Sequence, residues 1–299
     1  MKRILFLSLL ISFFAAESQI VKVDSLTHWR KSFKAGLNLN QSQFSGNWKA
    51  GGVNSLGFTT LLNFKANYQK DKVSWDSEFD FLYGMVNNAG QGYRKTLDRI
   101  YFDTKYGHAL SSKWNMYVAL NFQMQFAKGY KYLEGKVNRD SATLISDFLA
   151  PAFITTSIGF QYQPSPAFKV RISPFSPRIT IVKDPTRLTK TVAERPYGVD
   201  STKIVRYEWL AAQILAEFNK DLAPNFNLKF RYLMFANYEH LNLKEIDHRL
   251  DVLLTAKVSR FINASLTGIL LYDYDQDSGL QFREAFSLGI LYTFQNYKS

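Results

Sequence analysis

The histidines are the side chains of this sequence best suited to acid–base or metal chemistry. The four histidines, His28, His108, His240 and His248, are scattered along the chain, and no pair has the spacing of zinc ligands. The Gly-x-Ser-x-Gly turn of a hydrolase nucleophile does not occur in the sequence. An acyl hydrolase embedded in a membrane barrel would need a histidine such as His248, on the outer face near the external rim. A histidine at the end of a strand is more often an interfacial residue, so we expect no catalytic residue and no enzyme.

Alternating aspartates near the C-terminus are the best candidates for metal ligands. Asp273, Asp275 and Asp277 stand two residues apart, and carboxylate oxygens suit hard cations. The segment lacks the glycine and the closing glutamate of a calcium loop, so a solvated hairpin tip is the simpler interpretation. We expect neither a metal nor a cofactor.

The elements that would position these side chains are strands of strict alternation. Residues 286–294 carry aliphatic and aromatic side chains on one face and mostly small or polar ones on the other. Such a run suits a strand between lipid and a barrel interior, and it resembles the C-terminal signal read by the outer-membrane assembly machinery. Residues 56–68, 114–126 and 248–258 repeat the pattern. The alternative, an edge strand of a soluble β-sandwich, does not explain this recurrence.

We expect about twelve such strands, an even number typical of outer-membrane barrels. The connections alternate between short ones, such as residues 69–72 and 163–167, and long ones, such as residues 84–97 and 175–206. This alternation is typical of periplasmic turns and external loops, so the predicted fold is an all-β, antiparallel transmembrane β-barrel. The remaining strands are expected to begin near Phe33, Val73, Asp98, Phe148, Phe168, Tyr207, Phe226, Ile262 and Gln281.

The amino terminus and the composition agree with an exported protein. A basic start, an apolar run up to Ala16 and the small residues Ala16 and Ser18 indicate a signal peptide over residues 1–18. We expect an N-terminal periplasmic segment over residues 19–32 and the barrel over residues 33–299. The chain has no cysteine and is 16% aromatic, with a net charge of +12. This charge favours anionic envelope glycolipid as a partner, while the dispersed lysines and arginines argue against nucleic acid.

The predicted inner face carries charges of both signs. Such charges either line a narrow polar channel or cross-link neighbouring strands in a closed barrel. No ring of a single sign indicates an ion preference. The candidate lumen-facing residues are Lys65, Asp76, Glu78, Asp80, Asp103, Lys105, Arg171, Glu217, Lys229, Arg231, Arg249, Asp251 and Lys257.

Several motifs resemble a family of uncharacterised outer-membrane barrels from Bacteroidetes-type bacteria, domain of unknown function 3078. The resemblance extends over nearly the whole mature chain and implies location and architecture without an activity. Its most specific element is Asn-Trp-x-x-Gly-Gly-x-Asn-Ser at residues 47–55. Further motifs are Tyr83-Gly84, Arg94-Lys95 with Asp98, Gln125-Phe126 with Gly129-Tyr130, residues 146–151, Ser173-Pro174, residues 197–199 and Tyr272-Asp273.

The element at residues 47–55 is the candidate rim motif. Its glycines allow positive φ angles and its amides can bond the local backbone. It could form a constriction or a ligand-contacting patch, but turn chemistry alone favours a tight external turn. Farther along, Arg94 and Asp98 are expected to pair near Lys95. The candidate rim residues are Asn47, Trp48, Gly51, Gly52, Asn54 and Ser55.

The sequence favours a narrow channel, or porin, for small polar solutes in the outer membrane. A closed barrel that serves as an envelope scaffold, or binds partners through its external loops, is the alternative. In either case, we expect the partners to be outer-membrane lipid and glycolipid. We also expect the outer-membrane assembly machinery to bind the C-terminal strand.

Overall fold

The structure, a computed structural model, describes residues 28–43, 45, 54–90, 92–132, 142–188, 195–239, 242–259 and 261–296. Its first strands are β1 (Trp29–Ser42), β2 (Ser55–Lys70), β3 (Val73–Asn88), β4 (Gly92–Ala109), β5 (Trp114–Met124), β6 (Gly129–Tyr132), β7 (Ala142–Ser146) and β8 (Ala152–Ser165). These are followed by β9 (Phe168–Phe175), β10 (Arg178–Ile181), β11 (Val205–Glu208), β12 (Ala211–Ala223), β13 (Phe226–Asn237), β14 (Asp247–Lys257), β15 (Ile262–Asp273) and β16 (Asp277–Gln295). Short 3₁₀ turns are η3 (Pro185–Arg187), η5 (Pro196–Gly198) and η6 (Leu243–Glu245).

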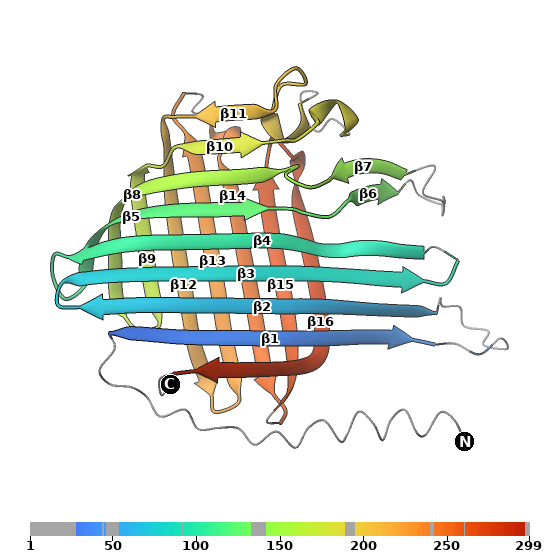
Figure 1. The fold of residues 1–299 in the computed structure, drawn as a ribbon, viewed down its shortest axis with the longest axis horizontal. Coiled ribbons are helices and arrows are strands. Elements are labelled where there is room, and N and C mark those ends of the chain that lie inside the picture. The colour runs from blue at the N-terminus through green and yellow to red at the C-terminus, as the bar shows by residue number, and fades with distance from the viewer. Residues whose placement is uncertain are drawn as a thin grey trace.

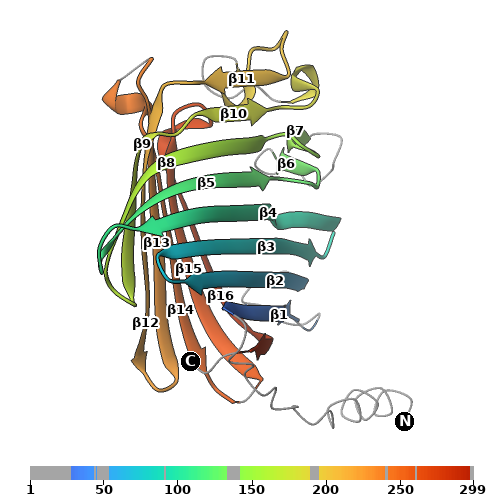
Figure 2. The ribbon, with the colours of Figure 1, turned by 60° about the vertical axis from the view of Figure 1, so that its left-hand side comes forward.

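Twelve strands close into an antiparallel β-barrel, as the sequence predicted (Figure 1). Strands β1 to β5 pair in order, β5 continues to β8, β8 to β9 and β9 to β12. Strands β12 to β16 follow in order, and β16 returns to β1. In Figure 2, β9 and β12 to β16 form one wall, and β1 to β5 with β8 form the facing wall. Strands β10 and β11 extend the sheet beyond β8, and β6 and β7 form a separate hairpin.

Alternation along each strand gives the barrel an apolar outer face and a polar interior. Apolar side chains point outward, where Phe286 is 67% and Leu56 53% exposed to the surroundings that a bilayer would fill. Their neighbours in sequence point inward and are mostly polar or charged, such as Asn63, Asp103 and Arg171. This is the apolar-out, polar-in pattern of membrane barrels.

Aromatic side chains gather where the short turns lie. That end also holds the start of β1 and the end of β16, so it corresponds to the periplasmic end of an outer-membrane barrel. The opposite, external end carries the long connections and β6, β7, β10 and β11. Tryptophan and tyrosine favour membrane interfaces, and three such pairs join neighbouring strands here: Trp29–Tyr68, Trp75–Tyr106 and Trp114–Tyr162.

Several strand limits differ from the sequence-based expectation. β1 begins at Trp29 rather than Phe33, because Trp29 to Ser32 continue the ladder with β2. β3 and β4 extend through the expected long loop at residues 84–97. A bulge at Thr96 breaks the alternation there: Gly84 lies opposite Leu97, and Met85 lies opposite Lys95.

Two strands on the external side start later than expected. β8 begins at Ala152 and not at Phe148, since Pro151 has no N–H to donate to a ladder. The run near Tyr207 is the short strand β11, and the barrel strand β12 begins only at Ala211. The expected signal peptide lies outside the described residues. No helix in the described part of the chain is long and apolar enough to cross a membrane.

Gly159 allows β8 and β9 to approach closely, which yields a first prediction. A Cβ at this position would lie 2.1 Å from the carbonyl oxygen of Ile172 and 2.7 Å from the Cα of Ser173. We expect Gly159→Val to lower the free energy of unfolding by about 1–3 kcal/mol or more, as overpacking does. Urea unfolding of the refolded barrel measures this effect, with the heat-dependent gel mobility as the readout of the folded fraction.

Gly268→Val is the matched control, since nothing lies within 4 Å of a Cβ there. Equal stability of the two variants would contradict the tight contact between β8 and β9.

Candidate functional site

Side chains of opposite charge stand in register on neighbouring strands of the barrel. Across β9, β12, β13 and β14, the residues Lys169, Glu217, Arg231 and Asp251 lie directly opposite one another. Opposite charges at directly paired positions stabilise a sheet. This row forms part of the inner surface of the wall that faces β4.

Side-chain contacts join the facing walls through the lumen, and two of them come from β4. Arg171 of β9 donates from Nη1 to Oδ2 of Asp103 on β4 at 3.0 Å. Arg231 of β13 bonds the hydroxyl of Tyr101 on β4, and its guanidinium lies 4.5 Å from the centre of that ring. Tyr101 is 3% and Arg171 5% exposed. These side chains therefore narrow the lumen at the level of Tyr101, and we call this level the constriction.

Each carboxylate that the sequence predicted for the lumen has a base within hydrogen-bonding or ion-pair distance. Most of the predicted lumen charges are brought together in these pairs. The pairs are Asp76–Lys105 (2.9 Å), Glu78–Lys65 (2.9 Å), Asp80–Arg99 (3.7 Å), Asp103–Arg171 (3.0 Å), Glu217–Lys169 (3.0 Å) and Asp251–Arg249 (2.8 Å).

The remaining predicted lumen residues are bases without such a partner. Lys229 shares the inward phase of Arg231 on β13, and in the described residues neither has a carboxylate within 4.0 Å. Lys257 ends β14 at the periplasmic rim and is exposed.

Sequence reasoning missed several lumen residues. Tyr101 and Arg99 share the inward phase of Asp103 on β4, and this phase was the available signal for both. Tyr101 carries no charge, so a search by charge passed over it. Arg99 lies at the start of the strand expected from Asp98, and it was not included among the inward charges. Lys169 lies in the short strand β9.

Residues 176–188 and 195–210, which we call the mouth arm, reach across the external opening of the barrel. Arg178 of β10 donates to Oδ2 of Asp247 on β14 at 2.8 Å. Its guanidinium lies 3.2 Å from the ring centre of Phe235 on β13. Because β10 is paired with β8, these contacts span from one wall to the other.

A second ion pair holds β11 to the β15–β16 connection. Arg206 bonds Asp275 and lies 3.3 Å from Glu208. Burial lowers the pKa of Arg206, but the charges of Glu208 and Asp275 outweigh burial, so this pKa lies above its usual value. The cavity left beside these side chains measures about 20 Å³, close to the space that one water molecule needs.

The aspartates expected at a solvated hairpin tip are instead part of this mouth. Asp275 is held by Arg206. Asp273 is buried and accepts hydrogen bonds from the backbone N–H of Asp275 and from Gln276. The expectation of a solvated tip is wrong for these two residues because the mouth arm folds onto them, whereas Asp277 is exposed.

The mouth arm has a hydrophobic core of its own. Ala150, Val182, Leu188 and Val199 are buried together, with Leu144 of β7 and Tyr197 packed against them. Burial raises the pKa of the Tyr197 hydroxyl, which therefore stays protonated and donates to the carbonyl of Ile145 at 2.6 Å. The arm and the β6–β7 hairpin thus form one packed external structure.

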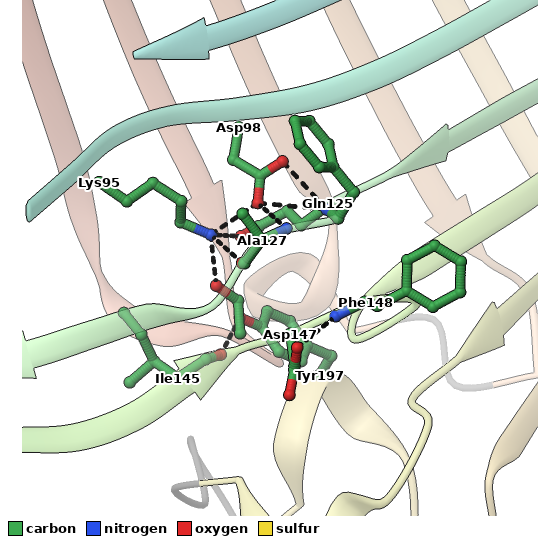
Figure 3. A network of polar contacts seen from close by, with 10 residues as sticks. Lys95, Asp98, Gln125, Ala127, Ile145, Asp147, Phe148 and Tyr197 are labelled. Atoms are coloured by element: carbon green, nitrogen blue, oxygen red, sulfur yellow. Dashed lines mark hydrogen bonds and ion pairs between the residues drawn. The ribbon is translucent and has the colours of Figure 1, made fainter. Parts of the chain in front are cut away.

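Lys95 and Asp98 tie the external end of β4 to this structure (Figure 3). Asp98 accepts hydrogen bonds from Lys95 at 2.7 Å and from the backbone N–H groups of Phe126 and Ala127 at 3.0 and 2.8 Å. Lys95 also donates to Gln125, the carbonyl of Ala127 and Ser146. The expected partner of Asp98 was Arg94, but its ion pair is with Lys95. The bulge at Thr96 changes which side chains share a face, which explains the difference.

The predicted rim motif is described only in part. Asn47, Trp48, Gly51 and Gly52 lie outside the described residues. Asn54 accepts a backbone hydrogen bond from Ala89 at 2.7 Å, and Ser55 begins β2 opposite Ser42 and Asn88.

His248 lies near the external end of β14, in the outward phase. Its Nδ1 is 2.8 Å from the hydroxyl of Tyr232, and its ring lies beside those of Tyr232 and Tyr272. This is an interfacial aromatic environment. In the described residues, no Ser or Asp side chain bonds this histidine.

A closed antiparallel ring with an apolar outer face and a paired-charge interior defines an outer-membrane-type β-barrel. The model of a family described as Protein of unknown function (DUF3078) matches residues 39–130, from β1 to β6. This match confirms the resemblance predicted from the sequence, over that part of the chain. No curated protein matches the chain.

Several solved structures of outer-membrane proteins are similar to this chain in the arrangement of their strands. The COG4313 outer membrane channel from Pseudomonas putida F1 is 10% identical, covers 93% of this chain and 98% of its own, and has a TM-score of 0.39. The NanC porin is 7% identical, and the match covers 88% of this chain and 98% of the porin, with a TM-score of 0.40. The translocator domain of the autotransporter NalP from Neisseria meningitidis is 9% identical. The match covers 91% of this chain and 91% of that domain, with a TM-score of 0.38. Likenesses this distant carry no argument about function.

The Asp98 network yields a second prediction. Asp98→Ala removes the acceptor of two backbone N–H groups and the partner of a largely buried ammonium. We expect the free energy of unfolding to fall by about 3–5 kcal/mol, as it does when a buried pair loses one member. Urea unfolding of the refolded barrel tests this. The control is Glu239→Ala, which removes an exposed external carboxylate and should leave the free energy of unfolding unchanged. An equal loss of stability in both variants would contradict the role of Asp98.

Proposed function

We propose that this protein is a narrow outer-membrane channel for small polar solutes. The observation that carries the proposal is the charged and hydrogen-bonding inner surface, which narrows at Tyr101 between β4 and β13. An interior of this kind solvates a polar solute in place of water. The apolar outer face and aromatic belts support a place in the outer membrane, after export by the expected signal peptide.

The width of the constriction sets the size of the solute. Tyr101 and Arg231 fill the space between facing walls, and Arg171 with Asp103 fills the space beside them. Passage therefore requires the contact between Tyr101 and Arg231 to open, while the Arg171–Asp103 pair keeps the walls in place. A gap opened by so few side chains suits small solutes.

A second candidate is a closed barrel that works through its external surface. The packed mouth arm favours it, because Arg178 and Arg206 bridge the opening and the arm has its own apolar core. A barrel of this kind would carry no current. Its partners would bind the external surface, and outer-leaflet glycolipid is the proposed class among them.

Conductance of the refolded chain in planar bilayers separates the two candidates. The channel should show small, stable conductance steps. Tyr101→Ala removes the largest side chain of the constriction and should raise the step size severalfold. Phe102→Ala, the outward neighbour on the same strand, should leave it unchanged. A folded protein silent in all three forms would contradict the channel.

A further inference from the structure

The lumen has an excess of positive charge, because the bases outnumber the carboxylates of the paired rows. Every carboxylate of those rows is already bound to one base. The bases left over, in the described residues, include Lys34, Lys229, Arg231 and Arg283, and none has a carboxylate within 4.0 Å. A base in a barrel interior that has no direct ion pair keeps donors with which it can bind a further anion.

Three of these bases lie with Lys65 around the constriction: Arg231 at it, and Lys34 and Lys229 on neighbouring inward positions. Lys229 stands two residues below Arg231 on β13, in the same inward phase. Lys34 of β1 faces inward beside the β2 strand that carries Lys65.

Arg231 bonds Tyr101, which lies opposite Asp80 of β3. Asp80 accepts a hydrogen bond from Asn63, the residue of β2 that lies opposite Lys34. This chain of contacts links the bases of β13 to those of β1 and β2 in one region of the lumen.

Carboxylates also face this region, and their partners are accounted for. Glu78 binds Lys65 and the amide of Asn63, and Asp80 accepts from the same amide. Glu217 binds Lys169. Asp221 lies at the exposed periplasmic rim and accepts from Asn227.

At the external mouth, by contrast, the carboxylates outnumber the bases among the side chains that contact one another. Asp247 is bound by Arg178, and Asp275 and Glu208 are bound by Arg206. Asp273 accepts hydrogen bonds, and among the described residues it has no base within 4.0 Å. The positive excess therefore lies deeper in the lumen, below the mouth.

We propose that Lys34, Lys65, Lys229 and Arg231 form a binding site for a small oxyanion, such as one bearing a carboxylate or a phosphate group. The inference rests on the proposed channel in one respect, since it names the solute class which that channel prefers. The guanidinium of Arg231 and the ammonium groups supply charged donors from facing walls. Charged donors of this kind bind carboxylate and phosphate oxygens strongly. The site would make the channel anion-selective, as lysine and arginine linings do.

The test compares the unchanged protein with the Lys34→Gln/Lys229→Gln double variant. Lys70→Gln/Lys72→Gln is the matched control, because it removes the same charge at an exposed periplasmic turn. Heat-dependent gel mobility first establishes that all three fold. Reversal potentials in a KCl gradient then give ion selectivity, and calorimetric titration with inorganic phosphate gives affinity without requiring any current.

We expect a chloride preference that is lost in Lys34→Gln/Lys229→Gln and kept in the control. The affinity for phosphate should fall about tenfold or more in the lumen variant, since two charged hydrogen-bond donors are lost. A conducting protein that prefers potassium, or shows no preference, overturns the oxyanion site and leaves the channel standing.

A silent protein refutes the channel, and the phosphate titration then decides the binding site alone. Binding lost only in the lumen variant supports the site. Absent binding, or equal loss in both variants, overturns it.

Discussion

A charged side chain inside a β-barrel needs a partner, and the rest of this structure depends on the contact between Asp103 and Arg171. These residues come from β4 and β9, which are separated in the ring by β5 and β8. Their contact, together with that of Tyr101 and Arg231, holds facing walls at a fixed separation. An unpaired charge at either position would cost several kcal/mol. The pairing therefore fixes the width of the lumen as well as its stability.

The external end is closed by a different kind of structure. Within the barrel, side-chain contacts span the lumen, whereas the mouth is bridged by an arm with its own apolar core. Arg178 and Arg206 link this arm to β14 and to the β15–β16 connection. A solute entering from outside would thus meet an arm held by ion pairs and then a constriction formed by side chains. The bases without carboxylate partners lie at and beyond that constriction.

Most of the barrel could be predicted from the sequence because period-two alternation is local. The inward phase of Lys65 and Glu78 follows from the apolar residues on either side of them. The predictions went wrong where something interrupted the period: the bulge at Thr96 concealed the start of β4, and Pro151 delayed β8. The partners of Asp98 and Asp275 could not be predicted, since they depend on how long connections fold in space.

The constriction itself could be predicted only in part. The sequence supplied Asp103, Arg171 and Arg231 as inward charges, but which of them meet depends on the curvature and stagger of the closed ring. Tyr101 was missed because it carries no charge. Its phase on β4 was visible in the sequence, but its contact with β13 was not.

A double-mutant cycle on Asp103 and Arg171 tests the central claim most directly. Free energies of unfolding would be measured for the unchanged barrel, Asp103→Asn, Arg171→Gln and the double variant, refolded in one lipid. The account predicts that each single change is costly and that the pair couples by at least about 1 kcal/mol, as residues in direct contact do. Strictly additive effects would mean that the two walls do not meet at this pair, and they would contradict the account.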